Sequence, residues 1–313
     1  MNRVIAIKPA VLSGGLHHTF DAYKGWKEIG GHCLHNVAQP RPLHYCYYHW
    51  SLPSLGKWRS KEARLRFVRS YALLFDTFPH YATHEIIPMF WDCWPDYFER
   101  VSSFLQRYQV RTAIFTSSMT AARMKQRFPH MNILSVPEGI DISPYYNNKK
   151  LAQRSIDILE FGRDNRRIIG DSYNSLPVNH LYSKNGERLF RTDQALYDGW
   201  ADSRICLAFP RCDTMPEVAG DIETLTQRYW ECMLSGSLMI GRAPKELIDL
   251  IGYNPVIDYD QQHGREQVLD ILQHIDKWQS LADQNYQTAL KYAPWSVSMQ
   301  KVKDSLLSLG YVV

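Results

Sequence analysis

Short apolar runs alternate with longer stretches of helical periodicity along the 313 residues of the chain. An apolar run of roughly four to eight residues between turn-forming residues is typical of a strand buried in a parallel sheet. Such runs occupy residues 4–7, 85–91, 111–118, 155–161, 202–210, 237–241 and 255–259. This alternation predicts an α/β fold, in which ligands bind at the carboxyl ends of the strands.

The first predicted strand leads into a glycine loop and then a helix, which together form the first half of a Rossmann-like unit. The loop contains Gly14, Gly15, His17 and His18, and the helix is predicted over residues 20–29. The two glycines either let the backbone approach a ligand or form a tight turn that needs a positive φ.

Residues 57–78 are predicted to form a basic amphipathic helix. Apolar side chains lie along one side of the helical projection and arginines on the others: Leu65, Val68, Ala72 and Phe75 against Arg59, Arg64, Arg66 and Arg69. The basic face either is solvated or docks on anionic lipid headgroups.

The most informative stretch joins a capped helix to a buried strand late in the chain. Thr224 and Gln227 fit a capping box, so the helix is predicted to begin near Leu225. It should end at Gly236, where the absence of a Cβ suits a left-handed cap. The amides of Leu225 and Thr226 would lack intrahelical partners, and the helix dipole is positive there, which suits a phosphate group.

Two glutamates accompany this helix. Glu223 lies on the loop before it, and Glu231 lies about two turns inside it. One carboxylate can therefore stand at each end of a long ligand, such as a diphosphate with a sugar at one end and a ribose at the other. The alternative is a pair of solvated acids beside a helix.

The sequence R-Y-W-E-C-M-L-S-G, which ends at Gly236, is similar to the R-x-F-E-x-x-x-x-G motif of group 1 glycosyltransferases of the spore-maturation type. The two glutamates resemble the acidic pair of the retaining, family 4-like GT-B glycosyltransferases. Residues 132–141 resemble the P-x-G-v-D element that leads from the first to the second domain in this group. The resemblance implies an α/β GT-B fold, with two Rossmann-like domains that face each other across a cleft.

The resemblance also implies a domain plan. Residues 1–146 would bind the acceptor, residues 147–294 would bind the nucleotide-sugar, and a helix in residues 295–313 would cross back to the first domain. The implied activity is a hexosyltransferase-like reaction. It would move a sugar from a UDP- or GDP-sugar to a glycan or lipid-linked glycan, with retention of configuration and with neither a separate cofactor nor an essential metal.

In the resembling enzymes the first glutamate lies beside the transferred sugar and the second accepts hydrogen bonds from the ribose. These roles fall on Glu223 and Glu231. The usual Gly-Phe-Gly after the first glutamate is missing here, so Glu217 and Asp221 remain alternatives to Glu223.

An arginine turn opens the predicted second domain. Arg163 stands where the family has an arginine that grips the diphosphate, and Arg166 or Arg167 stands where it usually has lysine. The alternative is an exposed basic turn. The remaining residues of the predicted donor site are Thr224, Leu225, Thr226, Gly14 and Gly15.

His17, His18 and Asp92 are the candidates on the acceptor side. Asp92 follows the predicted strand 85–91, at the end where ligands bind in an open α/β sheet. It is either an acceptor-side base or a cap for the helix that begins near Asp96.

Composition and charge narrow the protein class. With 45% hydrophobic and 22% charged residues and no apolar run of about 18 residues, we expect a globular cytoplasmic protein, with peripheral attachment to the inner face of the membrane as an option. The six cysteines have no C-x-x-C spacing, which argues against a zinc site or a disulfide framework.

The charge is asymmetric, with a net +9 over residues 1–150 and −5 over residues 151–313. A basic first half suggests an anionic partner: a lipid-phosphate acceptor, a membrane surface or nucleic acid. The ring-rich residues 41–60 could stack on a sugar or a nucleobase. Two alternatives to the glycan transferase therefore stay open, a non-catalytic GT-B binding module and a glycosyltransferase that acts on nucleic acid.

Overall fold

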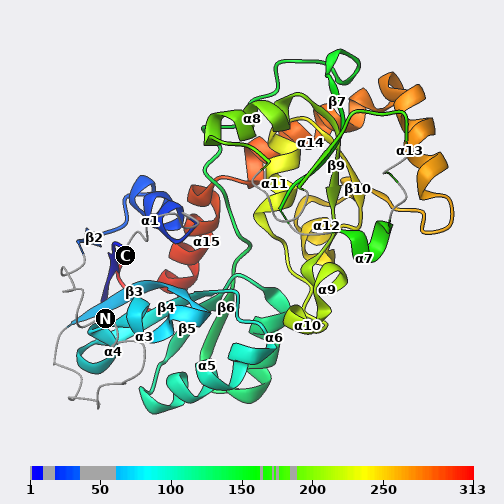
Figure 1. Ribbon diagram of the computed structural model, residues 1–313. Coiled ribbons are helices and arrows are strands. Elements are labelled where there is room, and N and C mark those ends of the chain that lie inside the picture. Colours follow the sequence, from blue (N-terminus) through cyan, green and yellow to red (C-terminus); the bar gives the residue numbers. More distant parts are fainter. Residues whose placement is uncertain are drawn as a thin grey trace. The chain divides into compact units, whose positions relative to one another are not determined.

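The computed structural model describes residues 2–9, 18–35, 61–162, 165–170, 173, 176–183 and 189–313, without the side chain of Arg166. The chain divides into two compact units. Unit 1 comprises Met1–Ile140, Val218–Ile222 and Trp295–Val313, and unit 2 comprises Asp141–Glu217 and Glu223–Pro294. Each unit contains a parallel sheet with helices around it (Figure 1). The predicted α/β class is confirmed.

Among the described residues of unit 1, the strand order is β2-β1-β3-β4-β5-β6, and all neighbouring strands are parallel. The strands are β1 (Arg3–Ile7), β2 (Cys33–Leu34), β3 (Glu62–Arg69), β4 (Glu85–Trp91), β5 (Thr112–Phe115) and β6 (Asn132–Ser135). The strand order reverses between β1 and β3, which is the type of position where ligands bind in open α/β sheets.

Helices cover both faces of this sheet. Helices α1 (His18–Glu28) and α15 (Trp295–Ser308) pack together on one face, over a core that includes Trp26, Phe67 and Trp295. The helices α3 (Leu73–Thr77), α4 (His80–Thr83), α5 (Pro95–Arg107) and α6 (Ser118–Arg127) contribute to the second core, and the turn η2 (Ser70–Ala72) precedes α3. The last helix of the chain therefore belongs to unit 1.

The predicted basic helix over residues 57–78 is wrong for residues 62–69, whereas residues 70–77 are helical, in η2 and α3. Residues 62–69 form the buried strand β3, and the arginines of this strand lie inside the unit. Arg66 is 2% exposed and donates to the carbonyl oxygen of Asp76, and Arg69 forms a 2.6 Å ion pair with the carboxylate of Asp76. Arg66 and Arg69 therefore form no exposed basic face, because Asp76 of α3 supplies their partners.

Among the described residues of unit 2, the strand order is β11-β10-β9-β7-β8, again parallel throughout. The strands are β7 (Ile156–Glu160), β8 (His180–Tyr182), β9 (Ser203–Ala208), β10 (Leu238–Gly241) and β11 (Val256–Asp258). The order reverses between β7 and β9. The carboxyl ends of these two strands are thus the expected binding position in unit 2.

The helices of unit 2 include α8 (Asp193–Ala201), α11 (Gln227–Leu234), α12 (Lys245–Ile251), α13 (Gly264–Gln273) and α14 (Gln279–Tyr292). Helix α11 packs on β10, β9 and α14. Short elements connect them: η3 (Leu151–Gln153), α7 (Arg166–Ile169), α9 (Arg211–Thr214), α10 (Pro216–Ala219) and η4 (Ile275–Trp278). Helices α13 and α14 are thus separated by the 3₁₀ turn η4. Within the described parts of the chain, no helix combines the length and apolarity needed to cross a bilayer.

Arg154 joins the start of unit 2 to two of its strands. Its guanidinium is 1% exposed and donates to the carbonyl oxygens of Ser203 and Ser235 at 2.8 and 2.9 Å, and to Oδ1 of Asn147 at 2.8 Å. Burial lowers its pKa to about 10, so the side chain remains a cation at neutral pH. The segment before β7 is therefore fixed against the amino ends of β9 and β10.

Gly236 ends α11 with φ +65°, which confirms the predicted glycine cap. A Cβ at this position would lie 2.4 Å from the side chain of Asn147, which Arg154 holds. Replacing Gly236 with Ala should cost about 1–2 kcal/mol of backbone strain, and more where Asn147 moves away from Arg154. Urea denaturation monitored by tryptophan fluorescence will measure this loss.

Gly252→Ala is the matched control. Gly252 also lies in unit 2, with φ +85°, but a Cβ there would meet no atom within 4 Å. The control should show the backbone strain alone. If both variants lost the same stability, the contact with Asn147 would have no energetic importance.

His80 is held in its neutral form inside unit 1. Burial, followed by the charges of Arg66, His84 and Arg64, lowers its pKa from 6.5 to about 3, and Arg66 donates to Nδ1 of His80 at 3.1 Å. As the pH falls, the unfolded chain binds this proton near pH 6.5 and the folded chain only near pH 3. The associated stability is thus present above about pH 6.5 and is lost below it, by up to about 1.4 kcal/mol per pH unit.

His80→Gln should therefore flatten the acid limb of the stability curve. Between pH 7 and 5.5 the parent should lose about 1 kcal/mol more than this variant in urea denaturation. His130→Gln, at an exposed position, is the control and should retain the steep limb. Parallel curves for the parent and His80→Gln would contradict this assignment.

Candidate functional site

The carboxyl end of β7 lies against helix α11 in unit 2. Gly162 follows β7 with φ +88°, and a Cβ on it would lie 2.4 Å from Nη2 of Arg228. Only glycine allows this close approach of the turn to the guanidinium. The turn after the first strand of unit 2 and the first turn of α11 thus share one position, at the point where the strand order reverses.

Arg228 lies over two aromatic rings. Its guanidinium carbon is 4.9 Å from the ring centroid of Phe161 and 4.9 Å from that of Trp200. Cation–π contacts of this kind stabilise a desolvated cation. The side chain is 17% exposed, and its Nη1 atom is buried without a hydrogen-bond partner in the described structure. Arg228 is therefore a fixed positive charge beside the turn.

Glu231 lies one turn further along α11. One carboxylate oxygen is 3.3 Å from Nε of Arg228, and the other accepts a hydrogen bond from the hydroxyl of Tyr145 at 3.3 Å. Burial, together with the charge of Glu231, raises the pKa of Tyr145, so the phenol stays protonated and donates. The ring of Tyr145 packs edge-on against Tyr197. The carboxylate is 18% exposed and keeps further lone pairs for a ligand.

Glu223 belongs to a second charge cluster, near the carboxyl ends of β9 and β10. Its carboxylate accepts hydrogen bonds from Nη1 of Arg242 and from the backbone amide of Lys245. Arg242 also forms two hydrogen bonds to Asp213, at 2.6 and 2.8 Å. The bonds to Asp213, and then those to Glu223, raise the pKa of Arg242. Glu223 is thereby fixed in position as a carboxylate beside a cation.

Helix α11 begins two residues later than predicted, at Gln227, with Thr226 as an N-cap whose side chain makes no capping bond. The carboxylate of Glu246 accepts the amide of Leu225 at 2.7 Å and the hydroxyl of Thr224 at 3.2 Å. The backbone amide of Leu225, which was predicted to bind a phosphate, therefore donates to the carboxylate of Glu246 from α12.

The two alternative acids have other partners. Glu217 forms a 3.2 Å ion pair with Arg167, and both side chains are exposed. Asp221 lies in the segment Val218–Ile222, which is part of unit 1, and is 2.6 Å from Arg123. The hydrogen bond from Arg123 lowers the pKa of Asp221. Of the three acids, Glu223 is the one held by a cation at the end of the sheet of unit 2.

No protein-family model matches the chain, and no curated protein matches it. Solved structures do match. HepE from Anabaena, solved in complex with UDP and glucose, aligns over 98% of this chain and 100% of its own, with a TM-score of 0.64 and 11% identity. The fold is GT-B.

Two further structures agree on this fold. Sucrose-phosphate synthase from Thermosynechococcus elongatus has a TM-score of 0.63 and 11% identity, over 98% of this chain and 99% of its own. AviGT4, a glycosyltransferase involved in avilamycin A biosynthesis, has a TM-score of 0.55 and 11% identity, over 99% and 98%. At this level of identity the GT-B likeness is one of fold.

The first unit of the GT-B fold contains two of the acceptor-side candidates. His18 begins α1 and is buried, with its ring centroid 5.8 Å from that of Trp91. Asp92 follows β4 with φ +51°, a conformation that non-glycine residues rarely adopt. The N-cap of α5 is Trp94, whose amide donates to the carbonyl oxygen of Asp92 at 2.8 Å. Asp92 is therefore not the N-cap residue of that helix.

Several predicted residues lie outside the described parts of the GT-B units. They are Gly14, Gly15, His17 and Arg163, together with the side chain of Arg166 and the ring-rich residues 41–60. In the remainder of the chain, which the structure describes, no group of three or more His, Cys, Asp or Glu side chains is arranged to hold a metal ion.

Sequence reasoning assigned no role to Arg228, Tyr145 or Arg242. Arg228 was visible as the first residue of the R-x-F-E motif, and a cation three residues before an acid on a helix is a signal for a local pair. Tyr145 and Arg242 carry no such signal, because their partners are distant in sequence.

Proposed function

We propose that the protein is a group 1, retaining GT-B glycosyltransferase that moves a sugar from a nucleotide-diphosphate sugar to an acceptor hydroxyl. The observation that carries the proposal is the contact of Gly162, Arg228 and Glu231 at the carboxyl end of β7. Structures of HepE with UDP and with UDP-glucose support a nucleotide-sugar as the donor.

Glu231 is proposed to bind the ribose. Tyr145 and Arg228 each contact one of its carboxylate oxygens, so the carboxylate is oriented before the ligand arrives. Each carboxylate oxygen can accept more than one hydrogen bond, and the vicinal hydroxyls of a ribose are a matching pair of donors.

The leaving diphosphate develops negative charge, which fixed cations can stabilise. Arg163 directly follows Gly162 in the sequence, so it is proposed to contact the diphosphate together with Arg166 or Arg167. The ion pair of Arg167 with Glu217 is exposed and therefore costs little to exchange for a phosphate. The positive end of the α11 dipole adds to this field.

Glu223 is proposed to orient the transferred sugar. In the proposed step the bond from the anomeric carbon to the diphosphate oxygen breaks, and the acceptor oxygen bonds to the same carbon from the same face. The acceptor proton passes to the departing diphosphate oxygen. Glu223, held by Arg242, would stabilise the positive charge that develops on the sugar.

The first unit is proposed to hold the acceptor, a glycan or lipid-linked glycan. His17 and His18 come after β1 in the sequence, and Asp92 directly follows β4, at the end of the strand where ligands bind in such sheets. The strained backbone of Asp92 is of the kind that occurs at functional sites.

One observation favours a second function, a non-catalytic GT-B module. Glu246 takes the amide of Leu225, so a bound diphosphate would have one amide fewer at this helix. Such a module would bind nucleotide without turnover, which an assay of donor hydrolysis across several nucleotide-sugars distinguishes.

A thermal-shift screen with UDP, GDP, ADP and CDP should find one clear stabiliser, by about 2.7 kcal/mol at 100 times its Kd. Replacing Glu231 with Gln should then weaken that nucleotide roughly tenfold or more, because the ribose hydroxyls lose a charged acceptor. Isothermal titration calorimetry measures the change.

Tyr145→Phe is the matched control, because it keeps the carboxylate and removes one neutral donor. It should weaken binding only a few-fold. Unchanged affinity in Glu231→Gln would exclude the ribose role. If none of the four diphosphates stabilised the protein, the proposed donor class would be wrong.

Glu223→Gln should separate turnover from binding. We expect turnover to fall by roughly 10²–10³, the usual loss when one electrostatic group is removed, with nearly unchanged nucleotide affinity. Glu217→Gln, at an exposed ion pair, should remain active. A reversed result, with Glu217→Gln inactive and Glu223→Gln active, would assign the sugar-side role to Glu217.

A further inference from the structure

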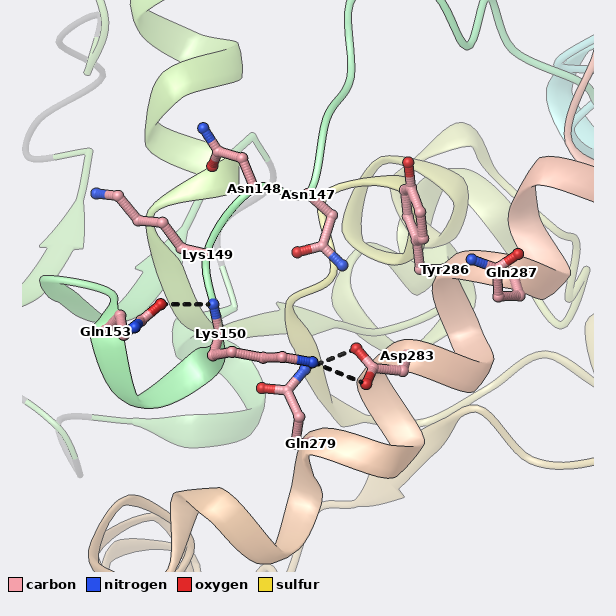
Figure 2. Close-up of a pocket in the computed structure, with 9 residues that line it drawn as sticks. All are labelled: Asn147, Asn148, Lys149, Lys150, Gln153, Gln279, Asp283, Tyr286 and Gln287. Carbon is pink, nitrogen blue, oxygen red and sulfur yellow. Dashed lines mark hydrogen bonds and ion pairs between the residues drawn. The ribbon is translucent and has the colours of Figure 1, made fainter.

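A polar cavity lies in unit 2, between the segment before β7 and helix α14 (Figure 2). Its volume is about 490 Å³, within the range of roughly 300–1,000 Å³ for small-molecule sites. Five amide side chains, two lysines, an aspartate and one tyrosine line it. This lining is unlike the mostly apolar walls of an ordinary ligand pocket.

The cavity lies at the amino ends of the strands of unit 2. Asn147, on its wall, is held by Arg154, which also binds the carbonyl oxygens of Ser203 at the start of β9 and Ser235 just before β10. Gly162 and Arg228 lie at the carboxyl end of β7. The cavity is therefore at the opposite ends of the strands from Gly162 and Arg228.

The walls of the cavity are fixed by internal bonds. Oε1 of Gln279 accepts the amide of Leu151 at 2.8 Å, and its Nε2 donates to Asp283 at 2.7 Å. The buried Arg154 fixes the opposite wall through Asn147. A cavity whose walls are already ordered costs a ligand little to occupy.

Each lysine of the cavity is paired with an aspartate, Asp283 in the lining and Asp202 outside it. Lys150 is 3.4 Å from Asp283 across the cavity (Figure 2), and Lys149 is 2.7 Å from Asp202. Each ammonium has a carboxylate partner, so the attraction of an anion to the lysines is offset by its repulsion from Asp283 and Asp202. The cavity favours an uncharged ligand.

Three side chains of the lining keep their hydrogen-bonding groups for a ligand. Within the described residues, Asn148, Tyr286 and Gln287 have no side-chain partner, and the amide nitrogen of Asn147 makes no bond. The amide groups of Asn148 and Gln287 each offer a donor and an acceptor in one plane, and Tyr286 adds an aromatic ring. Paired hydroxyls next to a C–H face, as on a sugar ring, complement this arrangement.

We propose that this cavity is a saccharide-binding site for neutral sugar units. The cavity lies at the amino ends of the strands, whereas Gly162 and Arg228 lie at the carboxyl end of β7, so a ligand here is not at the proposed position of the diphosphate. The site would hold remote units of a glycan while the donor site works. That use rests on the proposed function, whereas saccharide binding does not.

The test uses the full-length protein and short oligosaccharides as probes. Maltohexaose, cellohexaose and xylohexaose represent neutral chains, and hexagalacturonate represents an anionic one. Saturation-transfer NMR and calorimetry should detect at least one neutral oligosaccharide. Tyr286→Ala, and separately Asn148→Ala combined with Gln287→Ala, should weaken that binding roughly tenfold, since each removes a ring or two hydrogen-bonding groups.

Gln284→Ala is the matched control, because Gln284 is an exposed residue of α14 that does not line the cavity. It should bind like the parent. Binding of hexagalacturonate alone, no binding of any neutral chain, or equal binding by all variants would overturn the proposal. The double variant alters exposed residues, so the test stands even if Tyr286→Ala fails to fold.

The same variants should keep the parent's affinity for the nucleoside diphosphate, because they leave Tyr145 and Arg228, the side chains that contact Glu231, unchanged. This measurement separates the two proposals. A protein that binds an oligosaccharide through Tyr286 but no nucleoside diphosphate would contradict the transferase while supporting the cavity.

Discussion

The arrangement of unit 2 depends on the close approach of a guanidinium to a glycine. Arg228 can lie over Phe161 and Trp200 only because Gly162 has no side chain at this point. A largely desolvated cation needs compensation, which the ring faces and the carboxylate of Glu231 supply. The same contact holds the turn after β7 beside α11. A cation, an acid and a glycine turn thus meet where the strand order reverses, and the proposed chemistry depends on this position.

Buried arginines explain the clearest failure of the sequence analysis. Arg66 and Arg69 follow a helical projection, yet they lie in a central strand and bond to the main chain and carboxylate of Asp76. Periodicity assigns arginine to the surface, since an unpaired buried charge is costly. It cannot show that Asp76, in the following helix α3, will supply the partners. Arg154 repeats this behaviour in unit 2, where backbone carbonyls replace water around the cation.

The sequence correctly predicted structural features that depend on residues close together in the chain. The strand β4 and the glycine cap at Gly236 were predicted at their observed positions, because apolar runs and left-handed caps are properties of short segments. The start of α11 was misplaced because Glu246, from the next helix, binds Thr224 and Leu225. The partner of Glu231, Tyr145, was missed for the same reason. The pattern within one segment cannot predict a site residue whose role depends on contacts with distant parts of the chain.

The electrostatic potential differs between the amino and the carboxyl ends of the strands in unit 2, and this difference affects which ligands each end can bind. A parallel sheet collects helix N-termini at the carboxyl ends of its strands, and α11 begins there with its positive dipole end beside Arg228. The carboxyl ends suit a diphosphate. The C-termini of α8 and α11 lie at the amino ends, where their dipoles are negative. The lysines there are matched by Asp202 and Asp283. The amino ends of the strands therefore attract an anion only weakly. A neutral ligand with many hydroxyls can form hydrogen bonds to the amide side chains there without electrostatic repulsion.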